Sequence, residues 1–329
     1  MEFYCAAITE NGFFDLFSSV FSENNISRLY VIKGASGVGK STLMKKLALE
    51  GESRGIAVDR IYCSSDPSSL DGVIVGDVGM IDGTPPHTYE PRLAGAFETL
   101  IDLGRFWKRE LLTPHVDELR SLSLKKRAAF ERIYELSTIH GKFISFLERS
   151  SEAKLDEATI RRYVRSLVRR RLADAKDGKG EMRIFSSSFG DVKMPPHEQI
   201  YSVSDTFGSV FLEELRAELT ERGKEFFFSP SLPSIERIET IYVPSLRIVY
   251  TTRGGGRRIN GDRFFIEKPI EHGFENTISQ LLEAIKEKHR EAMSYHEMIE
   301  RIYLGAMDFE RMNEYTDQLF EEIFSYIGE

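Results

Sequence analysis

The chain has 329 residues, which is enough for about two domains of ordinary size. Hydrophobic residues make up 41% and charged residues 29%, a composition typical of a soluble globular protein with a sizeable core. The net charge of −8, from 44 basic and 52 acidic residues, does not favour nucleic acid or an anionic membrane as the partner of the whole chain. A local basic face that binds such a partner is still compatible with this net charge.

The cysteines and the apolar segments bear on the compartment. There are two cysteines, Cys5 and Cys63, so we expect no disulfide framework, and a reducing cytosol fits. No apolar run approaches the ~20 residues that are needed to cross a bilayer. Glu2 puts a negative charge where a signal peptide carries positive charge. We therefore expect a cytoplasmic protein without a membrane partner.

Two short elements are predicted at the start of the chain. Residues 3–9 are apolar and end at a turn-forming Glu-Asn-Gly sequence, which predicts a strand. Residues 13–21 carry aromatic and aliphatic side chains at helical spacing, which predicts a short helix over the sheet.

The next segment, residues 28–46, reads RLYVIKGASGVGKSTLMKK and contains the pattern G-x-x-x-x-G-K-S. An apolar strand precedes the glycines and a helix-forming run follows them, which is the context of a phosphate-binding P-loop. Lys40 is expected to reach the β- and γ-phosphates, and the Ser41 hydroxyl to ligate Mg²⁺. The residues predicted to bind the nucleotide are Gly34, Ala35, Ser36, Gly37, Val38, Gly39, Lys40, Ser41 and Thr42.

The chemistry of this loop depends on its main chain. Glycine adopts positive φ angles readily, so the loop can wrap its N–H groups around a phosphate. The helix that follows adds unpaired N–H groups and the positive end of its dipole. A glycine turn that only resembles the motif is the alternative, and the flanking strand and helix argue against it. The sequence therefore predicts binding of a nucleoside triphosphate, ATP or GTP.

A second strand is predicted at residues 56–63, and the helix before it is expected to stop near Gly55. The strand opens into the polar turn Ser-Ser-Asp-Pro, which contains Asp66. Consecutive strand–helix–strand units run parallel, so this turn should lie at the same sheet edge as the glycine loop. Asp66 is therefore a candidate catalytic residue.

Residues 78–87, VGMIDGTPPH, form an apolar strand that ends in an acidic residue, as in the second nucleotide-binding motif of P-loop proteins. Asp82 is expected to hold Mg²⁺ with Ser41 and to act in catalysis. The alternative is a turn-forming Asp before Gly83. No acidic residue follows Asp82 directly, and many motor ATPases have a water-activating Glu there. Asp66, Asp71 and Glu90 are the possible substitutes for it, and Thr84 or His87 could sense the γ-phosphate. For each of them taken alone, a solvated loop residue is the favoured alternative.

Long helical patterning follows Pro114 and extends to about residue 176. Between residues 160 and 172 an apolar stripe alternates with six arginines, for which a solvated face, a phosphate-binding lid and a nucleic-acid patch are the alternatives. The polar segment DAKDGKG at residues 174–180 marks a boundary. We expect one domain at residues 1–176, with a helical extension at about 110–176, and a second at residues 181–329.

The residues after this boundary repeat, in order, the pattern of those before it. The expected fold is therefore α/β: a P-loop NTPase parallel sheet sandwiched by helices, duplicated, with long helical extensions. The matched segments are 183–188 with 3–9, 200–203 with 30–32, 211–223 with 43–55, 228–238 with 63–73, and 246–252 with 78–84.

The second copy lacks the residues that bind phosphate. Residues 204–209 read SDTFGS, with one glycine and no lysine, and Tyr250 stands at the position matched to Asp82. A phosphate site without its positive charge and its glycines should bind weakly or not at all. The segment RGGGRR at residues 253–258 is either an arginine finger for the first site or a disordered loop.

Four segments, VIKGASGVGKSTLMKKL, CSSDPSSLDGVI, DGTPPH and GAFETLIDLGRFW, resemble an uncharacterised group of bacterial P-loop ATPases. That family has two tandem P-loop domains, each with a helical extension. The resemblance is close over residues 28–108 and only architectural after residue 180. It implies binding of ATP or GTP and names no substrate. Family members typically carry an intact loop in both halves, and this chain departs from that pattern in the second.

Three functions follow from these patterns. The first is a Mg²⁺-dependent ATPase that couples nucleotide state to a conformational change or to a protein partner. The second is a kinase-like phosphotransferase, in which Asp66 activates the hydroxyl of a small-molecule or nucleotide acceptor. The third is a nucleotide-gated binding module with negligible turnover. The partner, the acceptor and the association of two chains into an oligomer stay open.

Overall fold

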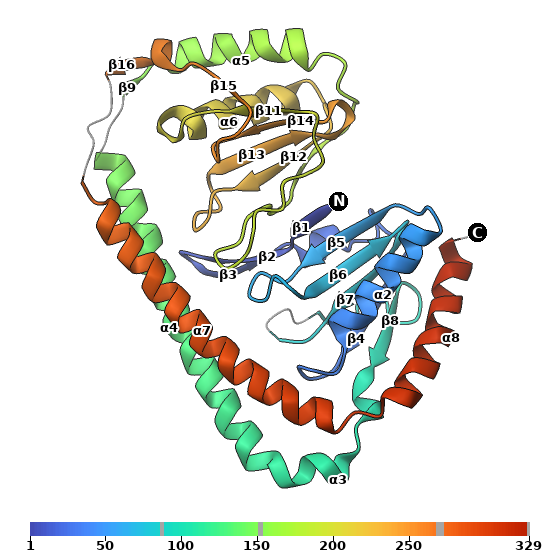
Figure 1. The fold of residues 1–329 in the computed structure, drawn as a ribbon. Coiled ribbons are helices and arrows are strands. Elements are labelled where there is room, and N and C mark those ends of the chain that lie inside the picture. The colour runs from blue at the N-terminus through green and yellow to red at the C-terminus, as the bar shows by residue number, and fades with distance from the viewer. Residues whose placement is uncertain (86–88, 151–153, 268–272, 328–329) are drawn as a thin grey trace. The chain divides into compact units, whose positions relative to one another are not determined.

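The computed structural model describes residues 1–85, 89–150, 154–267 and 273–327. These residues form two compact units, each built from segments that are separate along the chain (Figure 1). The first unit comprises Met1–Ala6, Asp15–Glu135 and Ala284–Glu329, and the second comprises Ala7–Phe14 and Leu136–Glu283.

The first unit contains a six-stranded sheet in the order β1-β5-β6-β7-β4-β8. Strand β6 runs antiparallel to both of its neighbours, and the remaining adjacent pairs are parallel. The expected all-parallel sheet is therefore wrong. The reason is a two-residue turn at Gly76 and Asp77, which pairs Val75 with Val78 and reverses the chain. The strands are Glu2–Tyr4 (β1), Arg28–Lys33 (β4), Val58–Tyr62 (β5), Leu70–Val75 (β6), Val78–Asp82 (β7) and Glu98–Asp102 (β8).

Two helices pack on this sheet, α2 (Lys40–Ser53) and α8 (Phe309–Ile327). Helix α8 buries an apolar stripe at helical spacing that includes Met312, Leu319 and Ile323. The C-terminal helix therefore belongs to the core of the unit that contains the N-terminus. The compact units consequently do not coincide with the division at residues 176–181 that is expected from the sequence.

The second unit contains another six-stranded sheet, in the order β10-β12-β13-β14-β11-β15. Strand β13 is antiparallel to both neighbours and the other adjacent pairs are parallel, so the two sheets share one pattern of order and direction. The strands are Gly180–Met182 (β10), Gln199–Ser202 (β11), Phe226–Pro230 (β12), Ile238–Val243 (β13), Ile248–Thr251 (β14) and Arg257–Arg258 (β15).

Helices α5 (Glu157–Arg171) and α6 (Asp205–Glu221) form one core with the second sheet. Helix α5 lies against α6, so the apolar stripe predicted at residues 160–172 is part of this core. The helical extension expected at about 110–176 contains two separate helices, α4 (Val116–Ser150) and α5, and α5 packs within the second unit.

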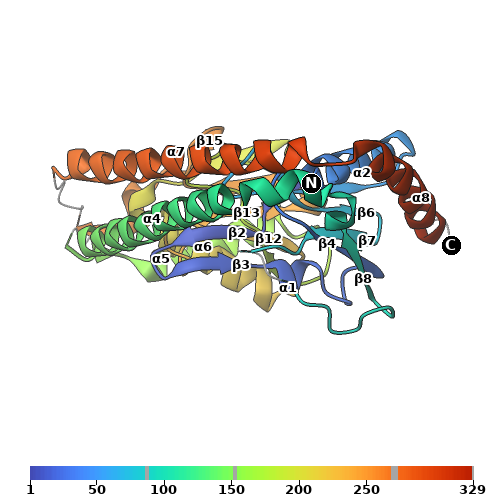
Figure 2. The ribbon, with the colours of Figure 1, turned by 90° about the horizontal axis from the view of Figure 1, so that it is seen from below.

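Helices α4 and α7 (Glu275–Gly305) run alongside each other in Figures 1 and 2. Within the described residues, no helix is both long and apolar enough to cross a bilayer.

The helix predicted at residues 13–21 is wrong in its first half, because residues 12–15 form strand β3, which pairs with β2. The remaining elements are Ala6–Thr9 (β2), Gly12–Asp15 (β3), Phe17–Val20 (α1), Leu103–Phe106 (η1), Arg109–Leu112 (α3), Thr113–His115 (η2), Lys154–Leu155 (β9), Pro244–Leu246 (η3), Asp262–Phe264 (η4) and Phe265–Glu267 (β16).

Candidate functional site

The glycine loop, residues 34–39, joins the end of β4 to the start of α2 in the first unit. Gly37 and Gly39 have φ angles of 80° and 87°, a conformation that residues with a Cβ rarely adopt. Gly39 is the N-cap residue of α2. A Cβ at Gly37 would lie 2.8 Å from the carbonyl oxygen of Glu300 in α7. Both the backbone conformation and the close packing therefore require glycine in this loop.

The main chain of the glycine loop presents a row of hydrogen-bond donors. Within the described part of the chain, the N–H groups of residues 35–39 donate to no carbonyl and to no side chain. The first N–H groups of α2 also lack intrahelical acceptors, as at the start of every α-helix. Free N–H groups at a helix N-terminus, together with the positive end of the helix dipole, attract an anion.

Lys40 places an ammonium group within the same loop. Its Nζ donates to the carbonyl oxygens of Gly34 at 2.7 Å and Ala35 at 3.0 Å, and it lies 3.4 Å from Oδ2 of Asp82. The Lys40 side chain is only 10% exposed and that of Asp82 only 14%. The contact arises because β4 and β7 are adjacent parallel strands, with Ile32 paired to Asp82.

The two oxygens of Asp82 have different surroundings. Oδ1 accepts hydrogen bonds from the main-chain N–H of Thr84 at 2.9 Å and from its hydroxyl at 2.6 Å, while Oδ2 faces Lys40. Asp82 therefore both stabilises the turn after β7 and places a carboxylate beside the glycine loop. Ser41 lies in the first turn of α2, where its hydroxyl accepts from the N–H of Leu70 at 2.9 Å, and Thr42 is exposed.

Asp66 lies in the connection between β5 and β6, and its carboxylate is used by that connection. It accepts from the hydroxyl groups of Ser68 and Ser69 and from the main-chain N–H of Ser68. Burial opposes ionisation of Asp66, but these hydrogen bonds from Ser68 and Ser69 hold its pKa below the usual value. A carboxylate that accepts this many hydrogen bonds from its own turn is a weak proton acceptor.

The other acidic residues that could replace a catalytic Glu are also engaged or enclosed. Glu90 pairs with Lys33 at 3.0 Å and is 75% exposed. Asp71 is buried on β6. Thr84 bonds to Asp82, as described above, and His87 lies outside the described residues.

The structure brings three further side chains to the glycine loop from the long helices. Lys126 on α4 has its Nζ 3.2 Å from Nδ1 of His296 on α7, and the hydroxyl of Ser36 lies 3.5 Å from the same nitrogen. Nε2 of His296 is 3.4 Å from Oε1 of Glu300. Sequence reasoning missed these residues because nothing local distinguishes Lys126 from its neighbour Lys125, and α7 is distant along the chain.

The electrostatics of Lys126 reflect its place next to the loop. Burial lowers its pKa, and repulsion from the positive charge of Lys40 lowers it further, with Glu300 acting in the opposite direction. Two ammonium groups therefore lie close enough to repel each other. An anion bound between them would remove that repulsion.

The arginines of α5 serve the second unit. Arg161 pairs with Glu214 at 2.8 Å and Arg165 with Glu218 at 3.3 Å, both across the contact with α6. These ion pairs favour a packing role over a nucleic-acid patch. The segment at residues 253–258, expected to be an arginine finger or a disordered loop, is ordered: Arg253 pairs with Glu239 at 2.6 Å and β15 follows.

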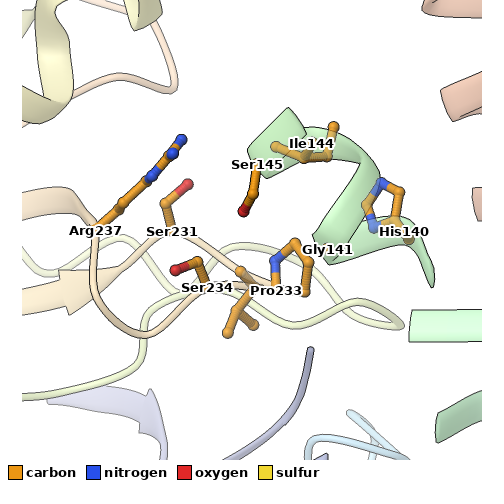
Figure 3. Close-up of a pocket in the computed structure, with 9 residues that line it drawn as sticks. His140, Gly141, Ile144, Ser145, Ser231, Pro233, Ser234 and Arg237 are labelled. Carbon is orange, nitrogen blue, oxygen red and sulfur yellow. The ribbon is translucent and has the colours of Figure 1, made fainter. Parts of the chain in front are cut away.

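The second unit also contains a small cavity of about 110 Å³ between α4 and the connection from β12 to β13 (Figure 3). Its polar lining includes Ser145, Ser231 and Arg237. Burial lowers the pKa of Arg237. None of the residues predicted to bind nucleotide or Mg²⁺ lines this cavity.

No protein-family model, curated protein or solved structure matches the chain. The case for a function therefore depends on the geometry of the glycine loop and its surroundings.

Proposed function

We propose that this protein is a P-loop NTPase that binds ATP or GTP with Mg²⁺ at the glycine loop of its first unit. The observation that carries the proposal is the row of N–H groups of residues 35–39 that have no protein acceptor among the described residues, in the same loop whose carbonyl oxygens hold the ammonium of Lys40. A triphosphate tail suits this loop, because it offers several anionic oxygens to the free N–H groups and to one largely buried cation.

Each residue has a defined part in this proposal. Lys40, which now donates to two carbonyl oxygens of its own loop, would donate to the β- and γ-phosphates. Ser41 and Asp82 would hold Mg²⁺, and their hydroxyl and carboxylate oxygens are the donor types that this ion prefers. Mg²⁺ would neutralise charge on the phosphates as they separate.

A metal ion that arrives with the nucleotide fits this pair better than a resident ion. Within the described residues, no group of three or more His, Cys, Asp and Glu side chains could hold a metal. Mg²⁺ typically binds one or two protein oxygens and takes its other ligands from phosphate and water. The two protein oxygens offered by Ser41 and Asp82 agree with that pattern.

Hydrolysis, coupled to a conformational change or to a protein partner, is the reaction that we propose. Phosphoryl transfer to an acceptor hydroxyl would need a free carboxylate as base, and that of Asp66 accepts hydrogen bonds from Ser68 and Ser69. Since no acidic residue follows Asp82, we expect slow turnover.

We also propose that the two sheets are copies of one ancestral unit and that the second copy binds no nucleotide. The shared strand order and directions support a duplication. The connection from β11 to α6 consists of residues 203–204 only, whereas the glycine loop from β4 to α2 consists of residues 34–39. Two residues are too few to wrap main-chain donors around a phosphate.

Calorimetric titration with ATP and Mg²⁺ tests this proposal. We expect one nucleotide per chain, much weaker binding by the Lys40→Ala variant, and release of phosphate from ATP without any added acceptor. Two equivalent nucleotides per chain would contradict the inactive second copy. An absence of binding in the presence of Mg²⁺ would contradict the proposal as a whole.

A further inference from the structure

The long helices α4 and α7 place a second cation against the glycine loop. Lys126 comes from α4 and is held by His296 from α7, and His296 is also within 3.5 Å of the Ser36 hydroxyl in the loop. The main chain of α7 itself touches the loop, since a Cβ on Gly37 would lie 2.8 Å from the oxygen of Glu300. All these residues belong to the first unit.

From this arrangement we propose that Lys126 contacts the γ-phosphate of the bound nucleotide and makes the protein distinguish a triphosphate from a diphosphate. The inference rests on the proposed nucleotide binding at the glycine loop. It names the element that would detect the nucleotide state: the paired helices α4 and α7, through Lys126 and His296.

The hydrogen bonding of His296 supports a switchable contact. A lysine ammonium can only donate, so Nδ1 of His296 accepts from Lys126 and the ring proton resides on Nε2. That proton points toward the carboxylate of Glu300, 3.4 Å away. A neutral imidazole is a weaker partner for an ammonium group than a phosphate oxygen is. A γ-phosphate within reach would therefore draw Lys126 away from His296.

The charges around Lys126 support the same conclusion. The partly buried ammonium is destabilised by Lys40, and the anionic group that acts against this repulsion is Glu300. Glu300 also faces His296, so the negative charge of Glu300 is divided between His296 and Lys126. A phosphate between Lys40 and Lys126 would pair with both ammonium groups at once. Release of Lys126 would also free Nδ1 of His296, which changes the link between α4 and α7.

The test compares dissociation constants of the ATP and ADP complexes, both with Mg²⁺, for the wild type and for Lys126→Ala and Lys126→Gln. We expect either substitution to weaken ATP binding by roughly 10- to 100-fold, the usual loss for one charge-assisted hydrogen bond, and to leave ADP binding nearly unchanged. Lys125→Ala is the matched control, because Lys125 is exposed and contacts the Tyr295 ring. It should change neither constant.

Retained ADP binding also shows that a variant is folded, so misfolding cannot imitate the expected result. Equal losses for ATP and ADP, or no loss for ATP, would overturn the role of Lys126 and leave the proposed nucleotide binding in place. If the wild type bound neither nucleotide, both proposals would fall together.

The imidazole proton signals of His296 in an NMR spectrum give a second readout. They should shift with a non-hydrolysable ATP analogue and stay nearly unchanged with ADP. The Lys126→Gln variant should lose this difference. Identical shifts with both nucleotides in the wild type would contradict the inference.

Discussion

The two sheets have the same strand order, yet the N-termini of the helices that follow β4 and β11, α2 and α6, differ. In the first unit the N-terminus of α2 is surrounded by the glycine loop, whose N–H groups of residues 35–39 stay free of protein acceptors in the described part of the chain. In the second unit the first turn of α6 carries Phe207, which is 2% exposed and packs on Phe211 and Phe264. The first turn of α6 therefore contributes an aromatic side chain to the core, whereas the first turn of α2 contributes Lys40 to the glycine loop.

The neighbouring strands differ in the same sense. Beside α2, the strand β7 ends in Asp82, which faces Lys40 at 3.4 Å. Beside α6, the residue in line with Asp82 is the uncharged Thr252, whose methyl group packs close to Gly208 of α6. The same strand order therefore occurs with a six-residue glycine loop and a Lys–Asp pair in one unit, and with a two-residue connection and no such pair in the other.

Replacement of Lys40 is the most severe test of this difference. We expect Lys40→Ala to weaken ATP binding by about 2–5 kcal/mol, or from roughly 30-fold to several-thousand-fold. The reason is that the variant lacks the largely buried ammonium group that would bind the phosphates. Lys46→Ala, on the exposed side of α2, is the control and should bind as the wild type does. Calorimetry measures both. Unchanged binding by Lys40→Ala would place the nucleotide elsewhere.

The glycines of the loop provide the second test. Gly37→Ala should destabilise the protein by about 1–2 kcal/mol through its φ of 80°, and more through the clash with Glu300. ATP binding should fall about tenfold or more, since a displacement of the donors by about 1 Å is enough for such a loss.

Gly55→Ala is the matched control for backbone strain. Gly55 follows the C-terminus of α2 with a φ of 74°, and nothing lies within 4 Å of the Cβ that would be added. Thermal unfolding should show a loss of similar size from backbone strain alone, with normal ATP binding. If the two variants bound ATP equally well, the loop geometry would not matter for the ligand.

How far the sequence predicts this molecule depends on the range of the interaction. The strand, glycine loop and helix around Lys40 are local and were readable from residue types. The strand β6 was missed, although Gly76 and Asp77 between two apolar runs are a hairpin signal. The α/β class is confirmed, while the all-parallel sheet is wrong for that reason.

Long-range packing set the limit elsewhere. The match of Tyr250 to Asp82 is displaced by two residues: with the hairpins superposed, Val78 corresponds to Ile248, which puts Thr252 in line with Asp82. The docking of α8 on the first sheet and the approach of Lys126 to the loop depend on tertiary contacts between distant segments. No local pattern encodes such contacts.

Asp82 and Thr252 test the comparison at the strand ends. Asp82→Asn keeps the shape of the side chain but removes the negative charge offered to Mg²⁺, so Mg²⁺-dependent ATP binding should weaken about tenfold. Thr252→Ala should leave binding unchanged, because the second sheet holds no nucleotide in our proposal. Titrations with and without Mg²⁺ measure both effects. A loss caused by Thr252→Ala would show that the second copy still takes part.

Asp66 gives the smallest expected effect and decides between a structural and a catalytic carboxylate. Because hydrogen bonds hold its pKa below the usual value, its stabilising contribution is present at neutral pH and is lost as the pH falls through the lowered pKa. Asp66→Asn should therefore cost about 1 kcal/mol at pH 7 and progressively less in acid, as measured by chemical denaturation.

Phosphate release then distinguishes the two roles of Asp66. A general base contributes about 10²–10⁴-fold to a rate, so loss of one would nearly abolish turnover. We expect Asp66→Asn to retain turnover, because Ser68 and Ser69 already occupy both carboxylate oxygens. Ser68→Ala is the matched control: it removes one hydrogen bond and leaves the carboxylate. If turnover collapsed in Asp66→Asn and persisted in Ser68→Ala, with ATP binding intact in both, Asp66 would be the base.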